Sequence, residues 1–569
     1  MTLQDLQAQL KKQKLDAYYI PRNTIFLEQD LLDEENLLLQ LTGFSGSAGK
    51  MILTPEKAHL FVDGRYDIQA QLEVNPLEVQ VHSVSEFTDF LTELETNNKN
   101  FRIGFNPWTS SIKEIPLFKA AKSTTSYIEK VLIEAKCNKK PVVFEHETEY
   151  AGLSREEKIS EVVARINVVG YDAYFTTLAD NTSWLLNLRS DYLPTSPIFR
   201  GYALIEKNSY VTIFSDDISQ EEFSDFKIIS MEKISTEFKK LSKKTLEINK
   251  ESTPYFLKSV FEKNRISTKN GYDYIAELKS QKNEVEIKST QKAHLKDGVA
   301  VTKFLYWFEK NALGKTELDI VEKLYEFRKQ QDLFFSNSFE TIAAFGSNGA
   351  IVHYQPTPKS NKKIENNNLF LLDSGGQYFD GTTDVTRTIV VGEINEEMKH
   401  DYTLVLKSHI ALATASFPEK INGGTIDALA REPLWAEGKD YKHGTGHGVG
   451  FFLNVHEGPQ SISSVYRYAP MKENVVISIE PGYYLEGKYG IRHENLYRVV
   501  KIEDKNFEKT ILSFESLTLI PFDIKGIDDK MLSNKEKEWL NNYQQKVCVA
   551  LSPFLTEQEN NWLINFCKN

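Results

Sequence analysis

Residue types that bind metal ions occur in a fixed order across the C-terminal half of the chain. Each lies in a glycine-rich or strand-like motif: Asp373, Asp384, His447, Glu480 and Glu494. Two carboxylates that face each other repel strongly unless cations lie between them. Four carboxylates and one imidazole can neutralise two divalent ions, which bridging carboxylates hold about 3.5–4 Å apart. This pattern is typical of a dinuclear metallohydrolase.

The types and surroundings of these residues also bear on the metal. An oxygen-rich set favours Mn²⁺, although Zn²⁺ or Co²⁺ would fit too. Taken alone, any one of these carboxylates is more often a solvated turn residue. However, Glu480 and Glu494 follow the β-type runs NVVISI and YGIR, which would place them in a core. A buried, unpaired carboxylate costs several kcal/mol, so a metal ion is its natural partner.

Three further histidines lie near this set in the sequence: His353 in GAIVHYQPTP, His443 in HGTGHGVG and His456 in NVHEGP. A lone histidine more often makes a structural hydrogen bond than takes part in catalysis. Here two of the three bracket His447, which favours a functional role. The glycines of HGTGHGVG would let the backbone approach the site closely or adopt positive φ.

A long amphipathic helix is expected ahead of all these motifs, with apolar residues at helical spacing from about Ile287 to Trp307. After it, strands such as LFLLDSG and VTRTIVV alternate with helices, which predicts an α+β arrangement. Asp373 ends an apolar strand, and Asp384 follows the glycine turns on the partner strand. A hairpin is therefore predicted to bring both carboxylates to one side.

The chain of 569 residues is too long for a single core, because such cores stop growing at about 250–300 residues. Its first part reads as an α/β unit over 1–152, and the same order of elements recurs over 153–278. The two are predicted to be related domains. The third unit spans 279–569 and includes a C-terminal extension from about 505.

Composition and sequence pattern argue against several classes of binding partner and cellular location. A formal net charge of −12 argues against a general nucleic-acid or anionic-membrane partner. We find no run of about 18 apolar residues, so no membrane span is expected. The first twenty residues lack the apolar core of a signal peptide. The cysteines Cys137, Cys548 and Cys567 lack metal-type spacing and indicate a reducing compartment. A cytoplasmic location is therefore predicted.

With these motifs, the chain resembles the long, three-domain, cytosolic-type aminopeptidase P (Xaa-Pro aminopeptidase) family. GFSGSAG with VDGRYDIQA resembles its first domain, and TSWLLNLR with PIFRGYALI its second. The third is similar in LLDSGGQY, TTDVTRT, HGTGHGVGFFLNVHEGP, EPGYY and GIRHEN. The resemblance spans nearly the whole chain. It implies two creatinase-like α/β domains followed by a pita-bread catalytic domain.

The same resemblance implies a role for each candidate residue. Asp373, Asp384, His447, Glu480 and Glu494 would bind two divalent metal ions, with Asp384 and Glu494 bridging both. His456 would bond to the scissile carbonyl region, and His353 and His443 would face the substrate or shuttle protons. Arg492 would lie just behind the ligands, near the substrate.

The implied reaction removes the N-terminal residue from peptides with proline in second place, by a metal-bridging hydroxide. Glu480 would pass the proton to the leaving amine, and His456 would stabilise the oxyanion. His353 would assist as a further catalytic group. The family also implies a homodimer.

Two other functions compete with this one. A prolidase of the same fold would cut only Xaa-Pro dipeptides, but the NVHEGP motif and the three-domain length favour the aminopeptidase. Some pita-bread domains have instead become inactive peptide-binding modules, as in histone-chaperone subunits. Retention of all five ligand residues and the absence of an acidic tail argue against that alternative.

Overall fold

The computed structural model describes residues 2–568 except 29, 99, 119–120, 124–140, 466–468 and 504–507. Cys137 lies outside the described residues. The chain divides into two compact units. Unit 1 comprises Met1–Thr148, Leu153–Leu193 and Ile198–Ile275, and unit 2 comprises Glu149–Gly152, Pro194–Pro197 and Ala276–Asn569. The domain boundaries expected from the sequence stay a prediction.

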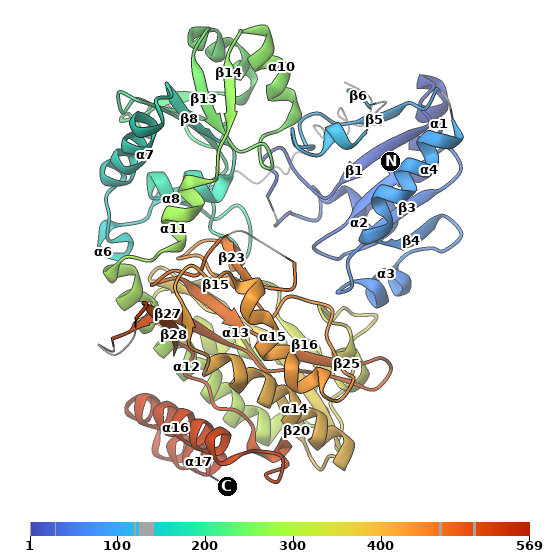
Figure 1. Cartoon of the computed structure of the whole chain (residues 1–569). Helices are drawn as coiled ribbons and strands as arrows, with labels where there is room; N and C mark the ends of the chain where they lie inside the picture. The colour runs from blue at the N-terminus through green and yellow to red at the C-terminus, as the bar shows by residue number, and fades with distance from the viewer. Residues whose placement is uncertain are drawn as a thin grey trace. The chain divides into compact units, whose positions relative to one another are not determined.

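Unit 1 contains two six-stranded sheets of the same topology (Figure 1). The first has the order β4-β3-β2-β1-β5-β6, from β1 (Ala17–Pro21), β2 (Lys50–Leu53), β3 (Ala58–Val62), β4 (Val79–Ser83), β5 (Ile103–Phe105) and β6 (Ala121–Ser123). The second has the order β12-β11-β10-β8-β13-β14, from β8 (Ala173–Thr176), β10 (Tyr202–Glu206), β11 (Val211–Phe214), β12 (Lys227–Ile229), β13 (Thr245–Ile248) and β14 (Ser267–Asn270). Corresponding neighbours run in the same relative directions in both sheets. The predicted pair of related α/β domains is confirmed.

Each of these two domains opens on a capped helix, α1 (Leu3–Gln13) in the first and α7 (Arg155–Val169) in the second. A capping box precedes both, because the side chains of Thr2 and Ser154 accept the backbone N–H three residues later. In α7 the chain then turns at Gly170, whose φ of 74° is easily reached only without a side chain.

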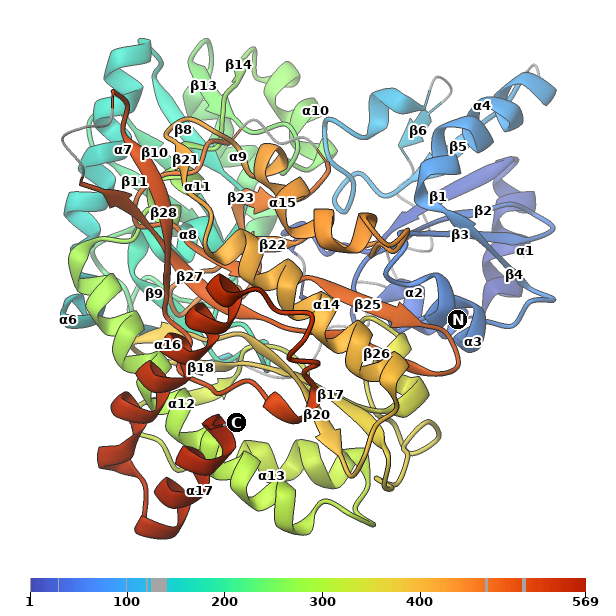
Figure 2. The ribbon, with the colours of Figure 1, turned by 60° about the horizontal axis from the view of Figure 1, so that its bottom comes forward.

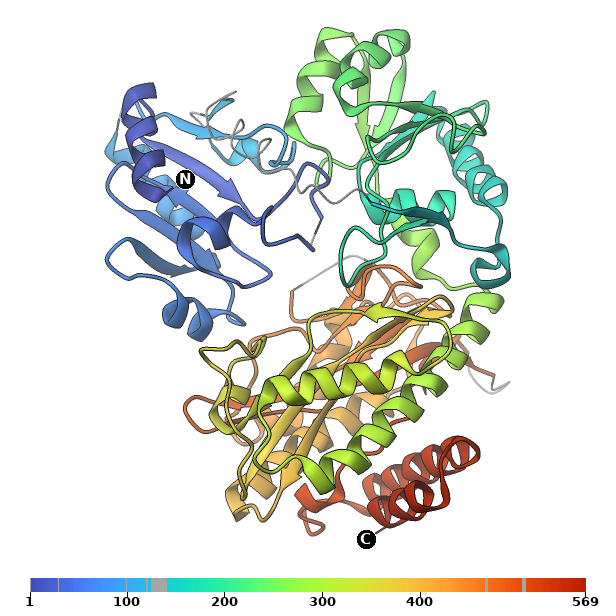
Figure 3. The same cartoon turned by 180° about the vertical axis from the view of Figure 1, so that it is seen from behind.

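The strands of unit 2 lie between the helices α12 (Glu284–Asn311), α13 (Glu317–Lys329), α14 (Glu396–Ala413) and α15 (Gly423–Trp435). Figure 2 shows α14 and α15 across one face of the strands, and Figure 3 shows α12 and α13 across the opposite face. The amphipathic helix expected from Ile287 to Trp307 is confirmed as α12, which buries Ile287, Phe304 and Phe308.

The strands between these helices carry the metal-type motifs. Two three-stranded sheets have the orders β16-β17-β20 and β15-β18-β19, from β15 (Phe334–Asn337), β16 (Ile342–Phe345), β17 (Asn368–Ser374), β18 (Gly376–Tyr378), β19 (Gly381–Thr382) and β20 (Val385–Val391). A six-stranded sheet has the order β21-β28-β27-β24-β22-β23, from β21 (Phe417–Pro418), β22 (Gly446–Gly448), β23 (Glu457–Ile462), β24 (Val476–Ile479), β27 (Asn495–Ile502) and β28 (Ile511–Ser516). A hairpin of β25 (Gly482–Leu485) and β26 (Tyr489–Arg492) links β24 to β27.

The chain ends in two helices, α16 (Asn534–Leu551) and α17 (Glu557–Cys567), which pack against each other and against α12. Capping boxes at Ser533 and Thr556 begin the two helices. Within the described residues, no helix combines the length and apolar character that a bilayer crossing requires.

Candidate metal centre

The five candidate ligands lie on or beside neighbouring strands of unit 2. Asp373 lies in β17, and Asp384 directly precedes β20, which pairs with β17 in the antiparallel direction. His447 lies in β22, Glu480 directly follows β24, and Glu494 lies between β26 and β27. Because β24 pairs with both β22 and β27, residues far apart in sequence end at one place in the fold.

Three of these side chains form a group of the size that one metal ion requires. Asp384, His447 and Glu494 offer ligand atoms that all lie within 4.8 Å of one another. His447 Nε2 lies 3.4 Å from Asp384 Oδ2 and 3.5 Å from Glu480 Oε1. Its Nδ1 lies 3.0 Å from the Gly448 carbonyl, which can only accept a hydrogen bond. The Nδ1 proton therefore leaves the Nε2 lone pair facing the carboxylates.

Arg492 offsets only part of the negative charge in this group, and the charge that is left supports a fit to metal ions. Burial, together with Asp373, raises the pKa of Asp384 well above its usual value. Burial and then Asp384 do the same to the pKa of Glu494, and burial raises the pKa of Glu480. Among the described residues, the buried atoms Asp373 Oδ1 and Glu494 Oε1 have no hydrogen-bond partner. Divalent cations would satisfy these oxygens and offset the repulsion.

Arg492 contacts this group through Asp373. Its guanidinium donates to Asp373 Oδ2 at 2.5 Å and to the Tyr484 hydroxyl at 2.6 Å. It also donates to the carbonyl of Val352, the residue before His353, at 3.3 Å. The arginine therefore connects one candidate ligand to the loop that carries a candidate catalytic histidine.

The other two histidines reach the site by different routes. His443 is buried, and its Nε2 lies 2.8 Å from the Tyr484 hydroxyl. His456 is exposed, and its ring centroid lies 4.3 Å from that of His447 in an edge-on arrangement. An exposed imidazole beside a candidate ligand is well placed to meet a substrate.

Two glycines of the motif HGTGHGVG allow close packing against neighbouring strands, and none of its four glycines adopts the positive φ that the sequence had suggested. A side chain at Gly446 would come within 1.9 Å of the Ser478 carbonyl, and one at Gly448 within 2.3 Å of the Glu457 carbonyl. These glycines let β22 lie tightly between β23 and β24. That packing brings His447 next to Glu480.

Sequence reasoning missed three hydroxyl groups at the site. The Ser478 hydroxyl accepts a hydrogen bond from the backbone N–H of His447 at 2.9 Å and donates one to Glu480 Oε1 at 3.2 Å. The Thr386 hydroxyl donates to Glu494 Oε2 at 2.7 Å, and Tyr484 joins Arg492 to His443. The only available signal was that each lies two or four residues from a candidate ligand.

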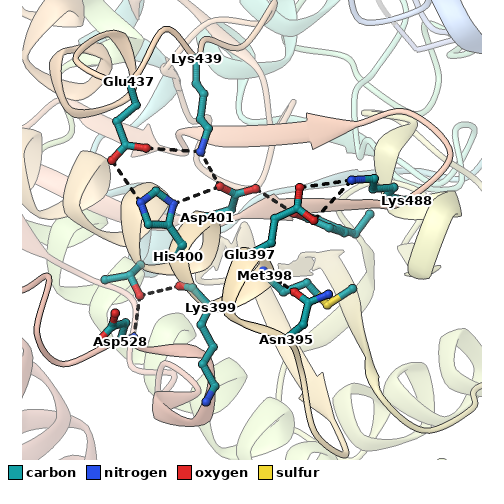
Figure 4. A network of polar contacts seen from close by, with 12 residues as sticks. Asn395, Glu397, Met398, Lys399, His400, Asp401, Glu437, Lys439, Lys488 and Asp528 are labelled. Atoms are coloured by element: carbon teal, nitrogen blue, oxygen red, sulfur yellow. Dashed lines mark hydrogen bonds and ion pairs between the residues drawn. The ribbon is translucent and has the colours of Figure 1, made fainter.

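A polar network holds the far end of the β25–β26 hairpin on α14 (Figure 4). Tyr489 donates a 2.8 Å hydrogen bond to Asp401, and Lys439 pairs with the same carboxylate at 2.6 Å. Asp401 is 3% exposed, so this carboxylate is a firm anchor. Tyr489 begins β26 and Arg492 ends it. The network therefore helps to place the Arg492 guanidinium beside Asp373.

The residue that follows His456 belongs to a buried cluster of charged side chains. Glu457 pairs with Lys279 at 2.9 Å and with Lys282 at 2.5 Å, and all three side chains are 2% exposed. We expect Glu457→Gln to lower the melting temperature and to lower kcat by up to about 10²-fold, because His456 would shift. Steady-state kinetics and thermal melts check this.

The matched control for that variant is Glu473→Gln, which breaks a surface pair with Lys501 in the same unit. It should change neither quantity measurably. A Glu457→Gln protein with wild-type kcat would contradict the expectation.

Comparison with known proteins places the chain in a family. Profiles of the creatinase/prolidase N-terminal domain match residues 3–129 and 134–286. Metallopeptidase family M24 matches residues 288–501, and the C-terminal region of peptidase M24 matches 510–569. Fold and site thus define an M24 metallopeptidase with two creatinase-type domains before a pita-bread domain.

Full-length relatives narrow this class. A probable Xaa-Pro aminopeptidase P of Sordaria macrospora is 33% identical, over 98% of this chain and 97% of the relative. Aminopeptidase P2 of Arabidopsis thaliana is 34% identical, over 97% of this chain and 85% of its own. The chain belongs to the Xaa-Pro aminopeptidase P family.

Solved structures agree with this assignment. The X-prolyl aminopeptidase of Caenorhabditis elegans, described as a cytosolic enzyme with a di-nuclear active site, is 31% identical with a TM-score of 0.90. That match covers 97% of this chain and 95% of the nematode protein. The prolidase of Pyrococcus horikoshii is 28% identical with a TM-score of 0.52, and it covers 64% of this chain and 99% of its own.

Proposed function

We propose that the protein is a metal-dependent Xaa-Pro aminopeptidase, which removes the first residue from peptides with proline in second place. The observation that carries this proposal is the convergence of His447 with the carboxylates of Asp384, Glu480 and Glu494. Asp384 and Glu494 are buried, and His447 and Glu480 are partly exposed. The full-length similarity to Xaa-Pro aminopeptidases supports the substrate class. The match to a prolidase extends over a smaller share of the chain.

We propose that Asp373, Asp384, His447, Glu480 and Glu494 hold two divalent ions. When bound, such ions act as Lewis acids and make water nucleophilic near neutral pH. Mn²⁺ is our proposed native metal, because four of the five ligands are carboxylates.

Side chains of the protein would bind the substrate and transfer protons beside these ions. Glu480 is the candidate to move a proton from water to the leaving amine, since its carboxylate lies beside His447 and burial raises its pKa. His456, exposed beside His447, would donate to the developing oxyanion. His353 and His443 would contact the peptide, and Arg492 would hold Asp373 in place.

The site chemistry also accounts for the proposed specificity. The nitrogen of proline in an amide carries no hydrogen, so recognition must use the shape of the ring rather than a donated hydrogen bond. A free α-amine would be attracted by the acidic group, which would restrict cleavage to the first residue.

Two further properties stay proposals. A cytoplasmic location is supported by the nematode relative, which is described as a cytosolic enzyme. A homodimer was implied by the resemblance to the family and can be tested by light scattering of the purified protein.

Metal-stripped protein reloaded with Mn²⁺ should release the first residue from Arg-Pro-Pro and turn over the dipeptide Ala-Pro much more slowly. A tripeptide offers a further residue beyond proline for binding, which a dipeptide lacks. Quantifying the released amino acid against metal concentration checks this expectation. Cleavage of the dipeptide alone would indicate a prolidase, and no cleavage with Mn²⁺, Zn²⁺ or Co²⁺ would favour a binding role.

A further inference from the structure

The C-terminal extension runs beside the strands that follow Asp384 and Glu494. After β28 the segment 517–523 runs beside both β27 and β20. The Leu517 N–H donates to the Leu496 carbonyl of β27 at 2.9 Å. Asp523 accepts the Val390 N–H of β20 at 2.9 Å. The extension is therefore hydrogen-bonded to the strand that follows Asp384 and to the strand that follows Glu494.

One side chain, Arg387 of β20, joins this segment to the candidate metal ligand. Its guanidinium donates to the Pro521 carbonyl at 2.9 Å and to the Ile520 carbonyl at 2.6 Å. It also donates to the Glu494 carbonyl at 2.6 Å and to the Thr386 carbonyl at 2.8 Å. The planar fork of five N–H donors suits this many acceptors at fixed angles.

Arg387 is an unusual buried cation. It is 2% exposed, yet no carboxylate in the described part of the chain forms an ion pair with it. Carbonyls, the Asn495 side-chain oxygen at 2.7 Å and the Tyr543 hydroxyl at 3.1 Å satisfy its donors instead. The ring of Phe522 covers it at 4.0 Å. Such burial is costly, which points to a role in placing its neighbours.

Helix α16 fixes the acceptors that Arg387 uses. The Tyr543 hydroxyl, besides accepting from Arg387, lies 2.8 Å from the Ile520 carbonyl. The next residue, Gln544, accepts the Phe522 N–H at 3.2 Å and donates to the Phe522 carbonyl at 2.9 Å. Segment 520–522 is therefore held on one side by α16 and on the other by Arg387.

We infer that the C-terminal extension positions the metal ligand Glu494, with Arg387 as the positioning residue between them. Arg387 fixes the Glu494 carbonyl, while the Thr386 hydroxyl fixes its carboxylate at 2.7 Å. A ligand held at both ends needs little ordering when an ion binds, so affinity rises. This inference rests on the proposed function only in that Glu494 binds metal.

The test is Mn²⁺ affinity of the metal-stripped full-length protein, measured by titration calorimetry without substrate. Arg387→Lys keeps the positive charge but loses the fork, and should weaken Mn²⁺ binding about 10–100-fold. Tyr543→Phe removes one hydroxyl and should weaken it about 3–10-fold in the same direction. The combined variant should lose less than the product of the two, because both act through one network.

The matched control is Lys407→Met, which removes a 2.9 Å ion pair to Glu536 at the start of α16. It should lower the melting temperature and leave Mn²⁺ affinity within about twofold, because this pair does not touch Arg387. If Arg387→Lys fails to fold, Tyr543→Phe decides the question alone.

Each outcome bears on one proposal or both. If the wild-type protein binds Mn²⁺ and the folded variants bind it with the same affinity, the positioning role is overturned and the proposed function stands. An equal loss in Lys407→Met would overturn it too, as a general stability effect. A wild-type protein that binds Mn²⁺ with variants weakened as expected, but cleaves no peptide, would support the positioning role and overturn the proposed function.

Discussion

Glu494→Gln is expected to abolish nearly all peptidase activity. The side chain keeps its shape but loses the charge and one acceptor oxygen, so the proposed binding of cations by this carboxylate would be lost. Because metal ions contribute several kcal/mol to the transition state of hydrolysis, kcat/KM should fall by at least about 10³-fold. Steady-state cleavage of Arg-Pro-Pro, with metal content measured on the same sample, checks the loss.

The same variant should gain stability when no metal is present. Glu494 is 1% exposed, and its Oε1 atom has no partner among the described residues. Neutralising an uncompensated buried charge should stabilise the fold by about a few kcal/mol. Thermal melts of metal-stripped wild type and variant near pH 8 test this. Glu473→Gln, which neutralises a surface carboxylate in the same unit, is the control and should change neither quantity.

A variant that retains two ions per chain and wild-type kcat/KM would show that Glu494 is not a metal ligand. A variant that is inactive and also less stable without metal would instead indicate a structural role for the carboxylate. The two measurements together therefore separate a metal ligand from a folding residue.

Metal removal is expected to destabilise the protein more at high pH than at low pH. Burial and neighbouring carboxylates raise the pKa values of Asp384 and Glu494 in the folded protein. Such groups favour folding below the unfolded carboxyl pKa of about 4, and that contribution is lost as pH rises through the raised folded values. The melting temperature of metal-stripped protein should therefore fall toward neutral and alkaline pH.

Bound metal should reverse this trend, because ions require deprotonated ligands and so bind more tightly as pH rises. At a free Mn²⁺ concentration a hundredfold above Kd, the stabilisation should be about 2.7 kcal/mol. Melting with and without Mn²⁺ at about pH 5.5 and pH 8 measures the difference. The rise in melting temperature on adding Mn²⁺ should be larger at about pH 8 than at about pH 5.5 in the wild type, and it should be nearly absent in Glu494→Gln. A difference independent of pH would contradict the assignment of these buried carboxylates as ligands.

Much of the fold was predictable because local signals and pattern agree. The capping boxes before α16 and α17 are short motifs whose geometry depends on residues three apart, so the sequence alone specifies them. The amphipathic spacing of α12 and the repeated order of elements in unit 1 likewise needed no long-range information.

The candidate site was predictable in its residues but not in its supports. Asp373, Asp384, His447, Glu480 and Glu494 stand out because metal-ligand types recur in glycine-rich or strand-like motifs. The hydroxyls of Ser478, Thr386 and Tyr484 carried no such signal, since serine, threonine and tyrosine are common in strands and turns. Their role depends on which strand lies beside which.

The sequence by itself determined the class of fold and indicated which residues are candidate ligands of the centre, because both follow from residue type and short-range spacing. Only the tertiary structure decided what holds the centre in place. Arg387 reaches the Ile520 carbonyl 133 residues away, and Lys279 reaches Glu457 across 178 residues. Pairings over such separations are set by the packing of whole strands and helices, and no local pattern in the chain specifies them.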